Sequence, residues 1–377
     1  MAQVVVSLIL IILTLGYVII VLFLRKGWKS IPPFKRSELA GKTKVSVLIA
    51  ARNEEKGIAF TIGDILAQSY PASLTELIIV DDHSTDRTAC IVDSYASRGV
   101  KLIRLLDNGK LNSYKKKAIS EAINHASGEL IVTTDADCRM GNRWLETIVS
   151  YYEKSGANLI SSPVVYHEEK SFFETLQTLE FLYLIGLGAS SIGNGAPSTC
   201  NGANLAYRRD VFFSLGGFRG IDDLASGDDE LFLHKVASHY PDSIRFCKSS
   251  EAVVYTNAKP TLREFILQRK RWASKSTRYK NKMIVALGLS IWAFNLLILL
   301  SAVLGFYDPA YWSLTIASLS VKFLVEMAFL LPITTFAKRR RLIWHLPLLT
   351  IIHVIYIVYI GIAGNSGRYM WKGRMVK

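Results

Sequence analysis

Long apolar runs occupy both ends of the chain and are absent from its middle. Residues 4–24, VVVSLILIILTLGYVIIVLFL, carry no charge and are long enough to cross a bilayer as a helix. Further apolar stretches lie at roughly 283–305, 311–332 and 343–363. The pattern predicts an N-terminal transmembrane anchor at 1–28, a polar domain at 43–260, and a C-terminal membrane region at 283–377 with about three spans.

Basic residues beside these runs predict the orientation. A cleavable signal peptide has basic residues before its apolar run, whereas Arg25, Lys26 and Lys29 follow it here, which favours a retained anchor. Lys and Arg stay on the cytoplasmic side of a membrane, so we expect a multi-pass protein of the inner cell membrane with a cytoplasmic central domain. The basic run at 338–341 agrees. The basic tail fits less well, because four spans would leave it outside; it contains Arg368, Lys372, Arg374 and Lys377.

The central domain alternates strand-like and helix-like segments. Buried-strand patterns lie at 45–51, 76–82, 101–106 and 129–135. Helical patterns lie between them, at 53–68, 85–97 and 114–127. This alternation predicts an α/β fold with a Rossmann-like mixed, mainly parallel sheet covered by helices on both faces. In such sheets ligands bind beyond the carboxyl ends of the strands.

Polar residues gather where the predicted strands end: Asn53, Asp81, Asp82, Asp135 and Asp137. Asp135 and Asp137 are one residue apart and repel each other unless a positive group lies between them. A divalent cation such as Mg²⁺ or Mn²⁺ would serve, because carboxylates and substrate phosphates are its usual ligands. A neighbouring Lys or Arg, or a solvated turn, is the alternative. For Asp81 and Asp82 the alternative is capping of the following helix.

Composition narrows the class of protein. The chain is 50% hydrophobic with a mean hydropathy of +0.25, more apolar than an ordinary soluble enzyme. Its net charge of +14 is concentrated beside the membrane segments, where anionic lipid headgroups account for it, and no nucleic-acid module is recognisable. We therefore expect membrane lipids as partners and no nucleic acid. The cysteines lack a CxxC spacing and are expected to be free thiols: Cys90, Cys138, Cys200 and Cys247.

The ordered set of motifs resembles a known family. The motifs are AARNEE at 50–55, IIVDDHSTD at 78–86, TTDADC at 133–138, GDDE at 227–230 and QRKRW at 268–272. Together they resemble the family-two glycosyltransferases, particularly the membrane-integrated branch with cellulose, chitin, hyaluronan and poly-N-acetylglucosamine synthases and ceramide glucosyltransferases. The resemblance covers roughly residues 43–280. It implies an A-type glycosyltransferase fold plus transmembrane helices.

The resemblance implies a site for a nucleotide sugar. Ala51, Arg52, Asn53 and Glu54 would contact the nucleotide. Asp81 or Asp82 would bind the base, usually uracil. Asp137 would bind the metal directly, with Asp135 oriented toward the sugar or sharing the metal. Lys115 would approach the diphosphate, the alternative being that Lys115 to Lys117 form a solvated helix face.

The same resemblance implies an acceptor side. Inverting transfer needs a carboxylate that takes the acceptor's proton, and GDDE offers Asp228 and Asp229. The register of the following residues favours Asp229, with Asp228 or a simple helix cap as alternatives. Plausible acceptor contacts are Asn201, Gly202 and Asn204, and a turn is expected at Gly216 and Gly217. The apolar stretch at 172–192 would dock on lipid or pack in the core.

Residues 261–282 are predicted to form an amphipathic helix on the inner membrane surface. The resemblance adds that Gln268, Arg271 and Trp272 form a QxxRW signature, and the spacing places them on one helix face. Trp272 would pack beneath the acceptor sugar. Arg271 would meet the departing diphosphate, because its planar fork donates two hydrogen bonds at once.

The predicted function is metal-assisted, inverting transfer of a hexose or N-acetylhexosamine from a UDP-linked donor. The acceptor would be a polysaccharide or a glycolipid at the inner membrane face. QRKRW favours the polymer-synthase branch, but three C-terminal spans are few for a pore, so polymer export would need a homo-oligomer or a partner. A single addition to a lipid acceptor is one alternative. A nonenzymatic nucleotide-binding membrane protein is the other.

Overall fold

The computed structural model describes residues 2–36, 41–106, 113–364, 369–371 and 374–376. The chain divides into two compact units. Unit 1 comprises Met1–Lys29, Lys170–Ser190 and Lys259–Gly367, and unit 2 comprises Ser30–Glu169, Ser191–Ala258 and Arg368–Lys377. The basic tail positions Arg368, Lys372 and Lys377 lie outside the described residues. A short antiparallel pair, β11 (Tyr369–Trp371) and β12 (Arg374–Val376), belongs to the last segment.

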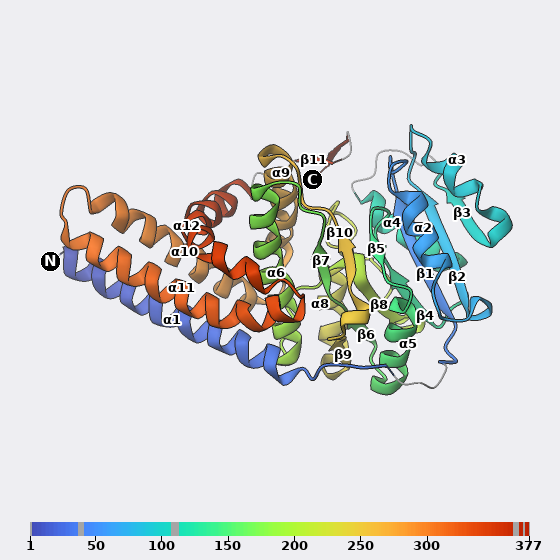
Figure 1. The fold of residues 1–377 in the computed structure, drawn as a ribbon, viewed down its shortest axis with the longest axis horizontal. Coiled ribbons are helices and arrows are strands. Elements are labelled where there is room, and N and C mark those ends of the chain that lie inside the picture. Colours follow the sequence, from blue (N-terminus) through green and yellow to red (C-terminus); the bar gives the residue numbers. More distant parts are fainter. Residues whose placement is uncertain (1, 37–40, 107–112, 365–368, 372–373, 377) are drawn as a thin grey trace. The chain divides into compact units, whose positions relative to one another are not determined.

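Unit 1 is helical, and the long helices are labelled in Figure 1. Within the described ranges, four helical segments are long and apolar enough to cross a membrane. They contain α1 (Ala2–Ser30), α10 (Lys282–Leu304), α11 (Ala310–Phe336) and α12 (Leu346–Ala363). This confirms the four apolar helices that the sequence predicts. Most of α6 (Phe172–Gly193) also lies in unit 1 and is largely buried, which favours core packing over lipid docking.

A buried polar cluster joins three of the long helices. Lys322 and Glu326 lie one turn apart on α11 and form an ion pair. Glu326 also accepts a hydrogen bond from the Tyr17 hydroxyl of α1 at 2.6 Å and from the Thr350 hydroxyl of α12 at 3.1 Å. Because polar groups in an apolar surrounding need partners, these contacts fix α1 and α12 against α11.

Unit 2 is built on a mixed sheet. Within the described residues the sheet has seven strands, in the order β3-β2-β1-β4-β8-β6-β9. The strands are β1 (Val45–Ala51), β2 (Thr75–Asp81), β3 (Val100–Arg104), β4 (Leu130–Thr133), β6 (Leu159–Ser161), β8 (Leu205–Arg208) and β9 (Ile244–Phe246). β1 pairs parallel with β2 and with β4, and β2 pairs parallel with β3. β8 pairs antiparallel with β4 and β6. The predicted mainly parallel sheet is confirmed.

The remaining elements of unit 2 are short. A three-stranded sheet contains β5 (Arg139–Met140), β10 (Val254–Thr256) and β7 (Val164–Tyr166). The helices are α2 (Ile58–Leu66), α3 (Thr88–Asp93), α4 (Tyr114–His125), α5 (Trp144–Ser155), α7 (Arg209–Ser214) and α8 (Glu230–His239). Both α2 and α3 are shorter than predicted. Asn53 has a φ of 51° and His83 a φ of 54°, so the chain turns after each strand before its helix begins.

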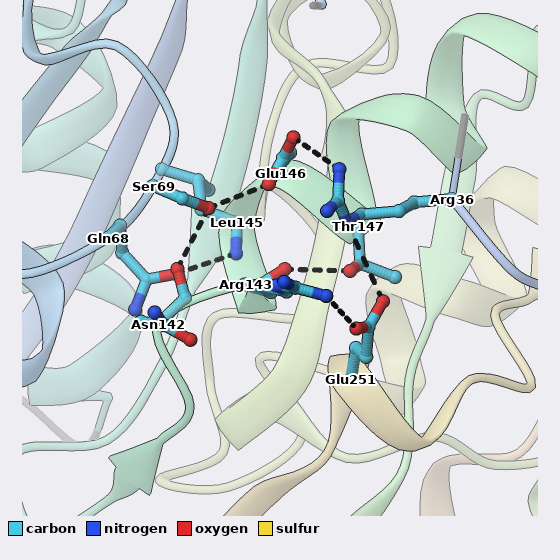
Figure 2. Close-up of polar contacts among 9 residues, drawn as sticks. All are labelled: Arg36, Gln68, Ser69, Asn142, Arg143, Leu145, Glu146, Thr147 and Glu251. Atoms are coloured by element: carbon cyan, nitrogen blue, oxygen red, sulfur yellow. Dashed lines mark hydrogen bonds and ion pairs between the residues drawn. The ribbon is translucent and has the colours of Figure 1, made fainter. Parts of the chain in front are cut away.

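Residues 31–36, which follow α1, belong to unit 2, and Figure 2 shows the ion pairs of Arg36 there. Arg36 Nη1 lies 2.7 Å from Glu146 Oε1, and Arg36 Nε lies 3.8 Å from Glu251 Oε2. Arg143 Nη1 also pairs with Glu251 Oε1 at 3.1 Å. The Phe34 amide donates to the Lys248 carbonyl oxygen at 2.8 Å. These contacts hold the described end of the segment, residues 31–36, against the domain that carries the sheet.

At the amino end of the parallel strands, Glu76 joins three segments. Its carboxylate accepts hydrogen bonds from the Ser46 hydroxyl, the Ser127 amide at 2.5 Å and the Gly128 amide at 3.1 Å. Burial alone would raise the pKa of Glu76, but these donors stabilise the charged form and lower it. Glu76 therefore connects β1 and β2 to the turn that precedes β4.

We expect Glu76→Gln to destabilise unit 2 by roughly 1–3 kcal/mol at neutral pH, because an amide cannot accept all of these bonds. Since folding lowers the pKa of Glu76, its contribution is present above the ordinary value of 4.5 and is lost as the pH falls through the folded value. The thermal unfolding midpoint should thus differ from wild type at pH 7 and converge with it in acid. Glu121→Gln, on the exposed face of α4, is the control and should change little. An equal deficit at all pH values would contradict this account.

Candidate active site

The loops after β1 and β2 are joined by Asn53. The register pairs Ala51 with Asp81, so both strands end at the same edge of the sheet. Asn53 Oδ1 accepts the Thr85 amide at 2.8 Å, and its own amide donates to the Ser84 hydroxyl at 3.0 Å. The left-handed backbone of Asn53 aims its side chain at the neighbouring loop, and asparagine tolerates that conformation well.

The rest of the AARNEE motif completes this frame. Arg52 Nη1 donates to the carbonyl oxygens of Asp82 and His83, at 2.7 Å each. The Ala51 carbonyl oxygen accepts the Asp82 amide at 2.8 Å, and the Glu54 amide donates to the Thr88 hydroxyl at 2.7 Å. The structure therefore places all four predicted residues around the start of the IIVDDHSTD loop.

Asp81 and Asp82 are both buried at this edge. Asp81 is 6% exposed; its Oδ2 accepts the Ser84 amide at 3.3 Å, and its buried Oδ1 has no hydrogen-bond partner among the described residues. Asp82 Oδ1 lies 3.0 Å from His83 Nδ1. The helix-capping alternative does not hold for either residue, because Asp86 accepts the first amide of α3, that of Thr88, at 3.0 Å. A buried carboxylate oxygen without a donor is the kind of acceptor that a ligand N–H would satisfy.

The turn that carries Asp135 and Asp137 is fixed by α2. The Thr61 hydroxyl lies 2.8 Å from the carbonyl oxygens of both Ala136 and Cys138. The candidate ligand atoms of Asp135, Asp137 and Cys138 all lie within 4.8 Å of one another. That spacing suits a single cation.

The donor set indicates which metal would fit. Burial, together with the charges of Asp137 and Asp135, raises the pKa of the Cys138 thiol well above its ordinary value, so it stays protonated. The carboxylates of Asp135 and Asp137 are then the available ligands. Oxygen ligands select a hard cation such as Mg²⁺ or Mn²⁺.

Lys115 contributes a positive charge at the same place. Its Nζ lies 2.9 Å from Asp135 Oδ1 and 3.2 Å from Asp228 Oδ2. Burial lowers the pKa of Lys115, but the charges of Asp135 and Asp228 outweigh it and raise the pKa above its ordinary value. The solvated-face alternative is thus wrong for Lys115. One ammonium connects TTDADC with GDDE.

Asp229 is held by two backbone amides. It caps α8, with Oδ1 accepting the Glu230 amide at 2.7 Å, and its Oδ2 accepts the Gly202 amide at 3.0 Å. Gly202 is close to both acids: a Cβ there would lie 3.3 Å from Asp228 Oδ2 and 3.3 Å from Asp229 Cβ. The capping alternative is confirmed, yet the same carboxylate also contacts the predicted acceptor segment.

The two asparagines of the acceptor segment differ in location. Asn201 is partly exposed and accepts the Ala203 amide at 2.9 Å. Asn204 is 0% exposed; it accepts the Trp144 indole N–H at 3.0 Å and donates to the carbonyl oxygens of Pro163 and Ala252. A direct acceptor contact was expected of Asn204, but its side chain is committed to the interior. The turn expected at Gly216 and Gly217 is present, with φ of 69° and 56°.

The QRKRW motif lies on α9 (Leu262–Ala273), in unit 1. Within this motif Arg269 is buried and forms an ion pair with Glu180. The Cζ atom of its guanidinium lies 4.2 Å from the centroid of the Trp272 ring. The predicted helix over 261–282 is divided: α9 ends at Ala273 and a 3-10 helix follows at Ser274–Arg278, where the Ser274 and Ser276 hydroxyls donate to the carbonyl oxygens of Arg271 and Ala273 at 2.8 Å. The catalytic roles of Gln268, Arg271 and Trp272 stay predictions.

Sequence reasoning missed Arg269 and Glu180. Their signal was Glu180 itself, a charge in the middle of a mainly apolar helix, where a buried carboxylate requires a cationic partner. It also missed Thr61, which carries no sequence signature and acts only through its position beneath the Asp135 turn.

Part of the chain is similar in sequence to known glycosyltransferases. Residues 46–215 match the family described as Glycosyl transferase family 2. The chain is 30% identical over 254 residues to "Probable glycosyltransferase YdaM" of Bacillus subtilis, covering 65% of this chain and 58% of the relative. It is 28% identical over 190 residues to "Beta-monoglucosyldiacylglycerol synthase" of Nostoc sp., covering 50% and 40%. The chain thus spans about half the length of these curated relatives.

A solved structure has a similar fold. Mannosyltransferase PcManGT from Pyrobaculum calidifontis, in complex with GDP-Man and Mn²⁺, matches with a TM-score of 0.53 at 19% identity, covering 93% of this chain and 99% of that chain. At this identity the likeness concerns the fold. It confirms the predicted glycosyltransferase-type α/β architecture with added apolar helices.

Proposed function

Because residues 46–215 match the family described as Glycosyl transferase family 2, we propose that the chain transfers a hexose or N-acetylhexosamine from a nucleotide sugar, with inversion, to a membrane lipid. The observation that carries this proposal is the contact of Lys115 with both Asp135 and Asp228. It brings the candidate metal motif and the candidate base motif to one place. The basic flanks of the anchor favour a cytoplasmic location for this site.

The donor proposed is a uridine nucleotide sugar. The buried Asp81 Oδ1, which has no donor among the described residues, would accept the imide N–H of uracil. Arg52 and Asn53 hold the loop that contains Asp81, so they would fix the base pocket. In a guanine nucleotide the corresponding edge also offers N–H donors, so GDP-linked sugars belong in the same assay.

Asp137 and Asp135 would hold Mg²⁺ or Mn²⁺ at the diphosphate. The bound cation would neutralise charge on the nucleoside diphosphate leaving group. PcManGT, which shares the fold, has GDP-Man and Mn²⁺ bound, and this supports a metal of the same kind here. Lys115 would add a second positive charge beside Asp135.

Asp229 is the proposed general base. It would take the proton of the acceptor hydroxyl as that oxygen attacks the anomeric carbon from the face opposite the diphosphate. Its bond to the Gly202 amide attaches it to the acceptor segment, whereas Asp228 contacts the donor-side Lys115. Asp228 would therefore orient Lys115. Arg271 would stabilise the departing diphosphate, and Trp272 would contact the acceptor.

A lipid acceptor is favoured by the membrane helices and by the relative named for making monoglucosyldiacylglycerol. Sugar transfer to a lipid headgroup needs no pore. A polysaccharide acceptor is the second candidate, favoured by the QRKRW motif.

The test is donor turnover in lipid vesicles. The purified chain is placed in vesicles of phosphatidylglycerol and diacylglycerol with Mn²⁺ and, in turn, radiolabelled UDP-glucose, UDP-N-acetylglucosamine and GDP-mannose. We expect label from one uridine donor in the chloroform-soluble fraction, and no transfer in EDTA. Label in a high-molecular-weight glycan would instead support the polysaccharide acceptor. Binding of UDP without consumption of any donor would overturn the enzymatic proposal.

A further inference from the structure

A second lysine of α4 lies buried beside the site. Lys116 is 1% exposed, and its Nζ donates to the carbonyl oxygens of Ile221 at 2.5 Å, Leu224 at 2.8 Å and Ser226 at 2.7 Å. An ammonium has three N–H donors, so every donor of Lys116 has an acceptor in one short loop. The solvated-face alternative is wrong here too. The loop at 221–226 is organised around this cation.

The 221–226 loop leads directly to the two candidate base residues, Asp228 and Asp229. Ser226 is followed by Gly227, whose φ is 85°, and then by Asp228 and Asp229. The last carbonyl that Lys116 holds is therefore two residues from the first acid. A shift of this loop would move both carboxylates.

Isolated buried ammonium groups are costly, and this one is compensated locally. Burial lowers the pKa of Lys116, while the charges of Asp228, Asp229, Asp223 and Asp222 oppose that shift. The three carbonyl oxygens that accept from Lys116 and the charges of these acids favour its charged form against the effect of burial. An apolar side chain of similar length, such as methionine, would leave the carbonyl oxygens without donors.

Consecutive residues of α4 thus act on both parts of the site. Lys115 contacts the carboxylates of Asp135 and Asp228, and Lys116 holds the backbone that leads to Asp228 and Asp229. Because both lysines belong to one helix, the separation between the metal motif and the base is fixed by α4.

We propose that Lys116 is a positioning residue for the base, which sets the distance of Asp229 from the donor by holding the 221–226 loop on α4. This inference rests on the proposed glycosyltransferase function. Misplacing a catalytic group by about 1 Å can cost about 100-fold in rate, so loss of Lys116 is expected to lower kcat by about 10- to 100-fold. Donor binding should persist, because among the described residues the hydrogen bonds of Lys116 go to carbonyl oxygens of the 221–226 loop and not to Asp135 or Asp137.

The experiment compares full-length Lys116→Met with wild type in the same vesicles. Transfer from the accepted donor gives kcat and the donor KM, UDP binding with Mn²⁺ gives a Kd, and hydrogen exchange reports on residues 221–229. We expect a reduced kcat, an unchanged Kd and KM, and faster exchange confined to 221–229. Lys117→Met removes the same charge from the next position of α4 and is the control, expected to resemble wild type.

Each result decides the inference. Wild-type kcat in Lys116→Met, or equal losses of kcat and UDP binding, would overturn the positioning role. If Lys116→Met does not fold, Lys116→Gln, which retains two N–H donors, is judged by the same criteria. Failure of both variants to fold would make Lys116 a folding residue and reject the proposal. If the wild-type protein consumes no donor, the proposed function fails, independently of the role of Lys116. Unchanged hydrogen exchange at residues 221–229 in the variant would by itself reject the role of Lys116 in holding the loop.

Discussion

Asp229→Asn is expected to abolish sugar transfer while leaving nucleotide binding near normal. A general base contributes about 10²- to 10⁴-fold, and an amide cannot accept the proton of the acceptor hydroxyl. Asparagine keeps an oxygen that can accept the Glu230 or Gly202 amide and is itself a good helix cap, so α8 should stay in place. The measurement is single-turnover transfer from the radiolabelled donor, beside UDP titration in Mn²⁺.

Asp228→Asn is the paired variant for this assignment. Because Asp228 contacts Lys115, its loss should disturb donor geometry and lower turnover less than Asp229→Asn does. Unchanged turnover in Asp229→Asn with complete loss in Asp228→Asn would transfer the role of base to Asp228. Loss of α8 in the circular dichroism of Asp229→Asn would reduce that residue to a structural cap.

The second large effect is expected at Asp137. Asp137→Asn should remove a carboxylate ligand of the divalent cation and lower Mn²⁺-dependent turnover by about 10³-fold, the scale of other electrostatic contributions to a transition state. Unlike the Asp229 variant, it should also weaken UDP binding in Mn²⁺. Electron paramagnetic resonance of free Mn²⁺ measures the metal affinity directly.

The matched control is Asp93→Asn at the end of α3, where the carboxylate is exposed and pairs with Arg104. It should keep wild-type Mn²⁺ affinity and turnover. If Asp137→Asn binds Mn²⁺ and nucleotide like this control, the metal does not bind at the Asp135 turn.

The strands, and the sheet edge at which they end, could be predicted because each strand is indicated by its own continuous apolar run. The pattern VSVLIAA coincides with β1, and the second strand differs by one residue at each end, since buried runs in parallel strands read as continuous apolar segments. Helix starts could not be predicted as well. The turn at Asn53 depends on bonds to Ser84 and Thr85, which lie on another loop.

The roles of neighbouring residues of the same type could be distinguished only by their tertiary contacts. Lys115 and Lys116 have nearly the same local sequence, yet one contacts carboxylates and the other holds carbonyl oxygens. Asn201 and Asn204 belong to one motif, but only Asn204 is enclosed by Trp144, Pro163 and Ala252. The partners that enclose Asn204 come from distant parts of the chain, so the local sequence does not indicate them.

The most direct measurement is a cryo-EM map of the full chain in a lipid nanodisc with Mn²⁺ and UDP. We expect cation density in contact with Asp137 and the diphosphate, uracil against Asp81, and the Asp229 carboxylate facing the same bound ligand. Nucleotide density away from the carboxyl ends of β1, β2 and β4, or Asp137 and Asp229 in separate pockets, would contradict it.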